Sequence, residues 1–273
     1  MVSAAFDAGP LGTWIQAGPL VVSRPLIDAY AEAVDAPADG LAAPLFSVVA
    51  CYPVLFRAVD AVTPPSLRGA AVHGEHDVTV HRLVRPADVL TARARPTGFE
   101  ATRAGTAVQV EIVVTDEAAE PVATHWLTAI VRGATSIHRA GRIPARWIPP
   151  VSGEDRIVEL AVKIDADQPS RYAEVTGDRN AVHVDPAAGR DAGFGGVIAH
   201  GLGVLGLAAS ALVAAFSPEA PGRLARIRTR FSAPVPPGQM LAITAAEHGD
   251  GVAFEARTAA GPPALRDGWA VFR

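Results

Sequence analysis

Cysteine, aromatic residues and strong net charge are all scarce in this sequence of 273 residues. The single cysteine, Cys51, excludes an intrachain disulfide and a thiolate metal cluster within one chain, and it favours a reducing, cytoplasmic location. A formal net charge of -4 argues against a nucleic-acid-binding protein, because phosphate backbones require a concentrated basic surface. A local basic patch for a small polyanion is still compatible with this balance.

Long hydrophobic runs are absent as well. No stretch of about 18 charge-free apolar residues occurs, which argues against a membrane-spanning helix. The N-terminus lacks the basic and apolar regions of an export signal, so we expect a soluble protein without membrane contact. Hydrophobic residues nevertheless make up 49% of the chain, enough to bury one large core or two coupled cores.

The order of sequence features repeats on either side of a segment rich in Pro, Gly and Arg. That segment, Gly133 to Asp155, has no clean helical or strand period and is interpreted as a linker. Residues 30–35 are echoed by 172–178, and later residues 84–90 are echoed by 235–241. Two echoes in the same order indicate a duplicated unit. The predicted division is an N-terminal unit over 1–135, a linker over 136–155 and a C-terminal unit over 156–273.

Each half is predicted to begin with helices and to end in strands. A long apolar run lies early in each half, and the second of these, Val197 to Phe216, is apolar on all sides and predicts a buried helix. A helix over Gln168 to Val175, ended by Gly177, and a short helix opening at Asp185-Pro186 precede it. Strand-like runs follow at 71–82, 89–95, 107–115 and 122–131, and again at 224–231, 240–247, 252–258 and 265–272. The implied fold class is α+β, with a long central helix wrapped by an antiparallel sheet, made twice.

A carboxylate and an imidazole that could transfer protons lie early in the second half. Asp178 and His183 are five residues apart and share no helical face, but Gly177 and Asn180 favour a turn that brings them together. Such a pair, placed around one water molecule, can remove a proton from it and return a proton elsewhere. The amide of Gly201, at a predicted helix N-terminus, is suited to stabilise a negatively charged oxygen.

Residues 172–186 and 193–201 resemble the hydratase-2 motif of the MaoC-like family, in which an Asp and a His five residues apart precede Ile-x-His-Gly at the start of the hot-dog helix. The duplicated layout extends the resemblance to most of the chain and implies a fused double hot-dog. It implies (R)-specific hydration of trans-2-enoyl-CoA to (R)-3-hydroxyacyl-CoA. In that role Asp178 and His183 are the catalytic pair, Asn180 orients the site and Gly201 is the oxyanion donor. No metal and no cofactor are expected, since coenzyme A belongs to the substrate.

Two positions depart from the family pattern, and the first half lacks the machinery. Ala181 replaces the Pro that usually follows the Asn, and Ala209 stands where some relatives carry a hydroxyl. No His follows Asp35 at the required spacing, and Cys51-Tyr52 stands where His200-Gly201 stands in the second half. The resemblance therefore implies that the N-terminal unit is catalytically silent and shapes the acyl pocket.

Other functions stay open at this point. The same site run in reverse makes a dehydratase of 3-hydroxyacyl carrier-protein thioesters in fatty acid or polyketide synthesis. A non-catalytic hot-dog subunit of a complex is a third hypothesis, and a thioesterase is the weakest, because residues 197–216 contain no acidic side chain. The expected partner is an acyl-CoA or acyl carrier-protein thioester, and both a monomer and a homodimer are compatible with the fusion.

Several further polar residues have simpler interpretations. Arg226, Arg228 and Arg230 alternate along one strand and so share a face, which can hold coenzyme A phosphates but is more simply a solvated surface. His73 and His76, three apart on a strand, are expected on opposite faces, which argues against a metal site. The ring of His200 is expected to be structural. For Asp178 and His183 the simpler alternative is a capping Asp and a surface His.

Overall fold

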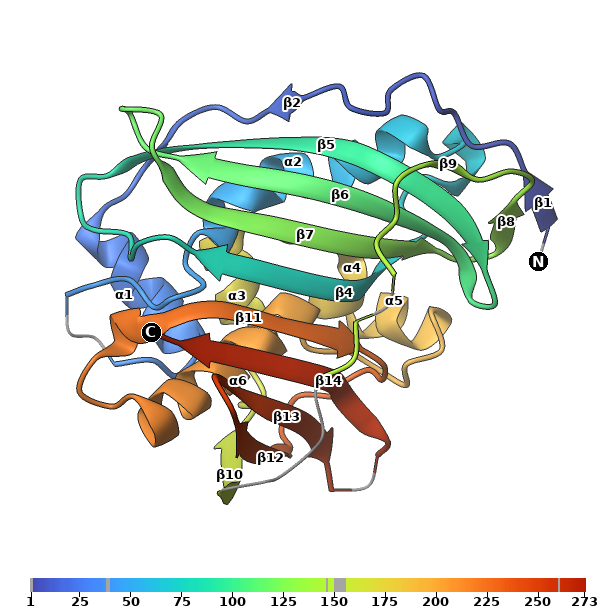
Figure 1. Cartoon of the computed structure of the whole chain (residues 1–273). Helices are drawn as coiled ribbons and strands as arrows, with labels where there is room; N and C mark the ends of the chain where they lie inside the picture. The colour runs from blue at the N-terminus through green and yellow to red at the C-terminus, as the bar shows by residue number, and fades with distance from the viewer. Residues whose placement is uncertain (1, 38–39, 146, 150–155, 260) are drawn as a thin grey trace.

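The computed structural model describes the chain except for residues 1, 38–39, 146, 150–155 and 260. Figure 1 shows two units side by side, each with a long helix lying against an antiparallel sheet. Part of the predicted linker, residues 150–155, lies outside the described residues, so the division of the chain into 1–135, 136–155 and 156–273 stays a prediction. Within the described residues, no helix is long and apolar enough to cross a membrane.

The N-terminal unit is built on one long helix and four long strands. Its main elements are α1 (Arg24–Ala33), α2 (Val48–Val62), β4 (Ala71–Val80), β5 (Val89–Thr102), β6 (Gly105–Thr115) and β7 (Pro121–Val131). Shorter pieces are β1 (Val2–Ala4), β2 (Ile15–Gln16), β3 (Leu20–Val21), η1 (Pro65–Leu67), β8 (Ala134–Ser136) and β9 (Ala140–Gly141). Helix α1 begins as its sequence favours, because the Ser23 hydroxyl accepts a bond from the Leu26 amide and Pro25 occupies the first turn.

The C-terminal unit repeats this plan and adds the short helices that carry the candidate site. Its strands are β10 (Ile157–Lys163), β11 (Leu224–Phe231), β12 (Met240–His248), β13 (Gly251–Thr258) and β14 (Pro263–Phe272). Its helices are α3 (Gln168–Thr176), α4 (Ala181–Val184), α5 (Pro186–Asp191), α6 (Gly201–Phe216) and the 3₁₀ turn η2 (Pro221–Arg223). The predicted buried helix is confirmed as α6, although it begins at Gly201 rather than Val197.

The two units share one sheet. Twelve strands are joined in it, and β4 of the N-terminal unit pairs antiparallel with β11 of the C-terminal unit, from Arg226 opposite Thr79 to Arg230 opposite Glu75. This seam places the start of β4 beside the end of β11, so side chains of both units meet there (Figure 1). The observed architecture confirms the predicted α+β double hot-dog.

Two residues at equivalent positions of the sequence repeat contact each other in the folded chain. The echoed residues Tyr30 and Tyr172 are both fully buried, and their ring centroids lie 6.1 Å apart where α1 packs against α3. Burying two aromatic rings against each other stabilises the junction between the units. One continuous hydrophobic core therefore contains both repeats, including Leu55 of α2 and Leu205 of α6.

Three predictions about strands differ from the structure. Strand β10 precedes the helices of the second half and was missed, because it is an edge strand with mostly exposed side chains. Strand β5 continues past Arg95, since a bulge between Pro96 and Gly98 accommodates residues that usually end a strand. The opposite-face prediction for His73 and His76 is wrong. A bulge between His73 and Glu75 shifts the alternation, and the two rings lie 5.4 Å apart.

Candidate active site

A tight turn between α3 and α4 places Asp178 and His183. Gly177 ends α3 in the left-handed region with φ 77°, a conformation that glycine adopts without strain. Asp178 Oδ1 then accepts a bond from the Asn180 amide at 3.2 Å, and Asn180 Oδ1 accepts one from the Val182 amide at 3.5 Å. The turn predicted from the sequence is present, and Asn180 serves it by capping α4.

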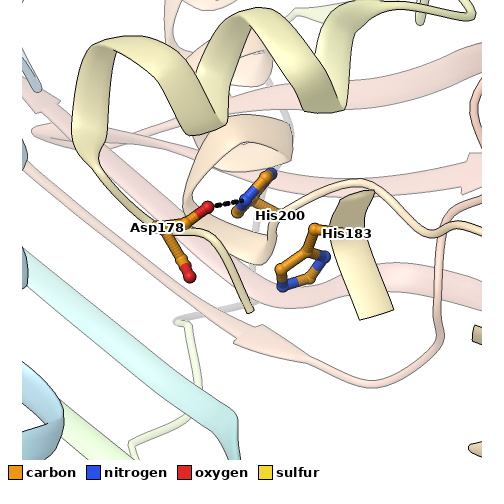
Figure 2. A group of neighbouring side chains, drawn as sticks. All are labelled: Asp178, His183 and His200. Carbon is orange, nitrogen blue, oxygen red and sulfur yellow. Dashed lines mark hydrogen bonds between the residues drawn. The ribbon is translucent and has the colours of Figure 1, made fainter. Parts of the chain in front are cut away.

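The two side chains converge. One carboxylate oxygen of Asp178 and one ring nitrogen of His183 lie within 4.8 Å of each other. Figure 2 shows the Asp178 carboxylate and the His183 ring on the same side of the turn. A water molecule hydrogen-bonded to each at about 2.8 Å spans such a gap. The arrangement can therefore hold one water between a carboxylate and an imidazole.

The tautomer of His183 follows from its backbone contact. His183 Nδ1 lies 2.9 Å from the Ile198 carbonyl oxygen, and a carbonyl only accepts, so Nδ1 carries the proton and Nε2 has a free lone pair. Burial lowers the pKa of His183 below its ordinary value, partly opposed by the Ile198 bond and the charge of Asp178. The imidazole is therefore neutral near pH 7 and able to accept a proton.

His200 braces both residues. Its ring stacks on His183 with centroids 3.9 Å apart, and its Nε2 donates to the Asp178 carbonyl oxygen at 3.0 Å (Figure 2). The side chain is 1% exposed, and burial together with His183 lowers its pKa to about 3. His200 thus ties the turn to the start of α6 as a neutral ring, a role that fits the structural assignment made from the sequence.

The same three side chains are of the types that bind metal ions, with one ligand atom each within 4.8 Å. His200 Nε2 donates its proton to the Asp178 carbonyl oxygen, whereas His200 Nδ1 has no hydrogen-bond partner among the described residues.

The amide of Gly201 is available to a ligand. As the first residue of α6, Gly201 has no intrahelical acceptor, and no described residue accepts a hydrogen bond from its amide. A Cβ at this position would stand 3.3 Å from the ring of Phe231, so the close approach favours glycine. The amide lies at the positive end of the helix dipole, where a developing oxyanion is stabilised.

These groups open into one cavity of about 1090 Å³. Both units line it, and the N-terminal unit contributes aromatic walls beside the polar groups of the C-terminal unit. The residues that matter here are Tyr52, Phe56 and His73 from the N-terminal unit, and Asp178, Asn180, His183, Gly201 and Phe231 from the C-terminal unit. The sequence analysis considered His73 only as a metal ligand and missed its place in the cavity, although Gly74 beside it is a typical signal of a bulge.

The three arginines of β11 share the predicted face but have different neighbours. Arg226 forms a double hydrogen bond with Asp77, at 2.8 and 2.5 Å. Arg228 lies 3.7 Å from the same carboxylate and 4.2 Å above the ring of Trp147. Only Arg230 of the three lines the cavity, with Asp267 at 3.9 Å.

Comparison with known proteins identifies a domain in the second half of the chain. Residues 149–262 match the family model described as MaoC like domain. A 3-hydroxyacyl-thioester dehydratase X of Mycobacterium tuberculosis is 28% identical over 188 residues, covering 67% of this chain and 62% of that protein. A probable enoyl-CoA hydratase 2 of Dictyostelium discoideum is 25% identical over 173 residues, covering 62% and 58%.

The aligned part thus spans less than two thirds of either relative's length. The crystal structure of a MaoC-like dehydratase from Phytophthora capsici superposes with a TM-score of 0.78 at 25% identity, covering 95% of each chain. Residues 149–262 therefore contain a MaoC-like domain, and the chain as a whole has the fold of a MaoC-like hot-dog protein.

Proposed function

We propose that this chain hydrates trans-2-enoyl-CoA to (R)-3-hydroxyacyl-CoA, with Asp178 and His183 acting on one water molecule. One observation carries the proposal. The Asp178 carboxylate and a ring nitrogen of His183 lie within 4.8 Å in a cavity that also contains the unengaged Gly201 amide. The relatives named as a hydratase and a thioester dehydratase support the same reaction class.

The protons can be followed through the site. His183 Nε2 accepts a proton from the water while the water oxygen bonds to Cβ of the enoyl group. Asp178 orients the water through a second hydrogen bond. Negative charge moves to the thioester oxygen, where the Gly201 amide stabilises it. The imidazolium returns the proton to Cα from the side on which the hydroxyl was added, so addition is syn. The (R) configuration is what the family resemblance implies.

Dehydration of a 3-hydroxyacyl thioester follows the same steps in reverse, as the name of the mycobacterial relative describes for that protein. The carrier of the acyl group, coenzyme A or an acyl carrier protein, is recognised outside the reacting centre. Arg230 in the cavity wall is suited to a phosphate of either carrier, since a guanidinium donates several hydrogen bonds in one plane. No resident cofactor takes part in the proposed reaction.

The direct test is turnover of trans-2-enoyl-CoA substrates of several chain lengths by the purified chain. We expect loss of the absorbance of the conjugated thioester, and a product that an (R)-specific 3-hydroxyacyl-CoA dehydrogenase oxidises. Matched crotonyl carrier protein, assayed beside crotonyl-CoA, separates the two carriers. Absence of turnover at every chain length and on both carriers contradicts the proposal. Activity that arises only when another protein is added would indicate a supporting subunit instead.

A further inference from the structure

Two buried histidines, His76 and His125, and the half-buried His73 form a row beside the cavity. His73 and His76 lie on β4, and His125 lies on β7. The ring centroids are 5.4 Å apart for the first pair and 5.3 Å for the second. His76 Nε2 lies 3.1 Å from His125 Nδ1, and His125 Nε2 lies 3.0 Å from the Ser47 hydroxyl. The row thus runs from the cavity wall to the residue that precedes α2.

Only His73 of the three lines the cavity that contains Asp178 and His183. Within the described part of the chain, no hydrogen bond reaches either ring nitrogen of His73, and its Nε2 is buried. Buried polar atoms without a partner destabilise a fold, and native proteins contain few of them. A polar ring kept without a partner in the wall of a ligand-sized cavity points to a partner that arrives with the ligand.

The surroundings of His73 define what it can offer. Its ring packs edge to face against Phe56 and Phe231, with centroids 5.6 and 5.5 Å away. The same Phe231 ring lies against Gly201, so one aromatic ring separates His73 from the candidate oxyanion amide. Burial lowers the pKa of His73 to about 4, opposed by the charge of Asp178, so the ring is neutral near pH 7. It presents one donor and one acceptor, without a charge.

We propose that His73 hydrogen-bonds the polar end of the bound acyl thioester, at the thioester carbonyl. The inference rests on the proposed function and adds to it a binding residue from the unit that lacks the catalytic pair. His76 is the one of the other two histidines whose ring lies against His73, at a centroid distance of 5.4 Å. The hydrogen bonds from His76 to His125 and from His125 to Ser47 hold in place the ring against which His73 packs.

Two substitutions separate the polar role from packing. His73→Phe keeps a planar ring of similar size and removes both nitrogens, whereas His73→Gln keeps a donor and an acceptor. We expect His73→Phe to raise KM for crotonyl-CoA about 3- to 10-fold, as for loss of one neutral hydrogen bond to the substrate. We expect His73→Gln to restore KM to within about twofold. His81→Phe is the matched control, because His81 is exposed and bonds to Thr124, outside the cavity.

A second measurement observes ligand binding to the wild-type chain directly. Wild-type chain labelled with ¹⁵N-histidine is titrated with butyryl-CoA, a saturated thioester that cannot be hydrated. We expect the ring nitrogens of His73, assigned with His73→Gln, to shift while those of His81 stay in place. An active wild type in which His73 does not shift, or in which His73→Phe keeps its KM, overturns the inference and leaves the proposed function intact. A wild type inactive on every thioester overturns both.

Discussion

Gly189 sits where α5 touches the loop that leads into α6, and replacing it by alanine is a sharp test of how the site is held. A Cβ at Gly189 would stand 2.0 Å from the Gly196 carbonyl oxygen. An ordinary C···O contact is about 3.3 Å, so the two backbones must separate by about 1.3 Å. Two residues beyond Gly196, the Ile198 carbonyl accepts the bond that fixes the tautomer of His183.

We expect Gly189→Ala to lower the free energy of unfolding by about 1–3 kcal/mol, the usual effect of overpacking. We expect kcat/KM to fall about 100-fold, because a displacement of about 1 Å in a catalytic group has that effect. Urea unfolding and turnover of crotonyl-CoA measure the two quantities. A loss of kcat/KM measured under conditions where the variant is folded reports the displacement of His183 rather than unfolding.

The matched control is Gly196→Ala, which adds the same methyl group to the other side of the contact. No atom lies within 4 Å of a Cβ there, and the backbone of Gly196 is not in the left-handed region. Its unfolding free energy should change by less than about 0.5 kcal/mol. If Gly189→Ala keeps wild-type kcat/KM, or if Gly196→Ala is equally damaging, the loop does not position His183 in the way argued above.

Three further predictions concern ionisation, carrier binding and the turn. The reaction needs neutral His183, and burial lowers the pKa of His183 below 6.5, so kcat/KM should fall in acid with a midpoint below pH 6.5. A midpoint at or above pH 7 is inconsistent with this base. Arg230→Ala should raise KM for crotonyl-CoA about 10-fold through loss of a charge-assisted hydrogen bond to the carrier. Arg226→Ala loses only the contact with Asp77, so its KM should stay within about twofold of the wild-type value. Equal effects of the two substitutions would mean that all three arginines of β11 form the binding surface. Gly177→Ala should lower the free energy of unfolding by about 1–2 kcal/mol in urea, since φ 77° is costly for alanine, and an unchanged midpoint would mean that the turn can relax.

The sequence was sufficient for features that depend on local chemistry and on the repeat. The duplicated tyrosines, the apolar run of α6 and the turn between Gly177 and Asn180 each have a local signal, and the structure contains all three. Asp185 caps α5 through the Ala187 amide, as its position before Pro186 predicts. The joint presence of Asp178 and His183 in one cavity follows from that local geometry.

Long-range contacts could not be derived in the same way. The bond between Ser47 and His125 joins residues 78 positions apart, and that between His76 and His125 joins residues 49 apart. Strand alternation placed His73 and His76 on opposite faces, and a single bulge at Gly74 reversed that result. A period of two holds only while the ladder is regular, so one inserted residue changes every face assignment beyond it.

The most direct test of the proposed mechanism is the turnover of Asp178→Asn and His183→Gln with crotonyl-CoA. Asn keeps the shape of Asp178, an oxygen for the Asn180 amide and the backbone carbonyl that His200 contacts, so this variant should fold as the wild type does. We expect kcat to fall about 100- to 10,000-fold in His183→Gln, the range for loss of a general acid or base. We expect a fall of about 100-fold in Asp178→Asn, as for misplacement of a reacting group, here the water. Wild-type rates in both folded variants would contradict the assignment of this pair.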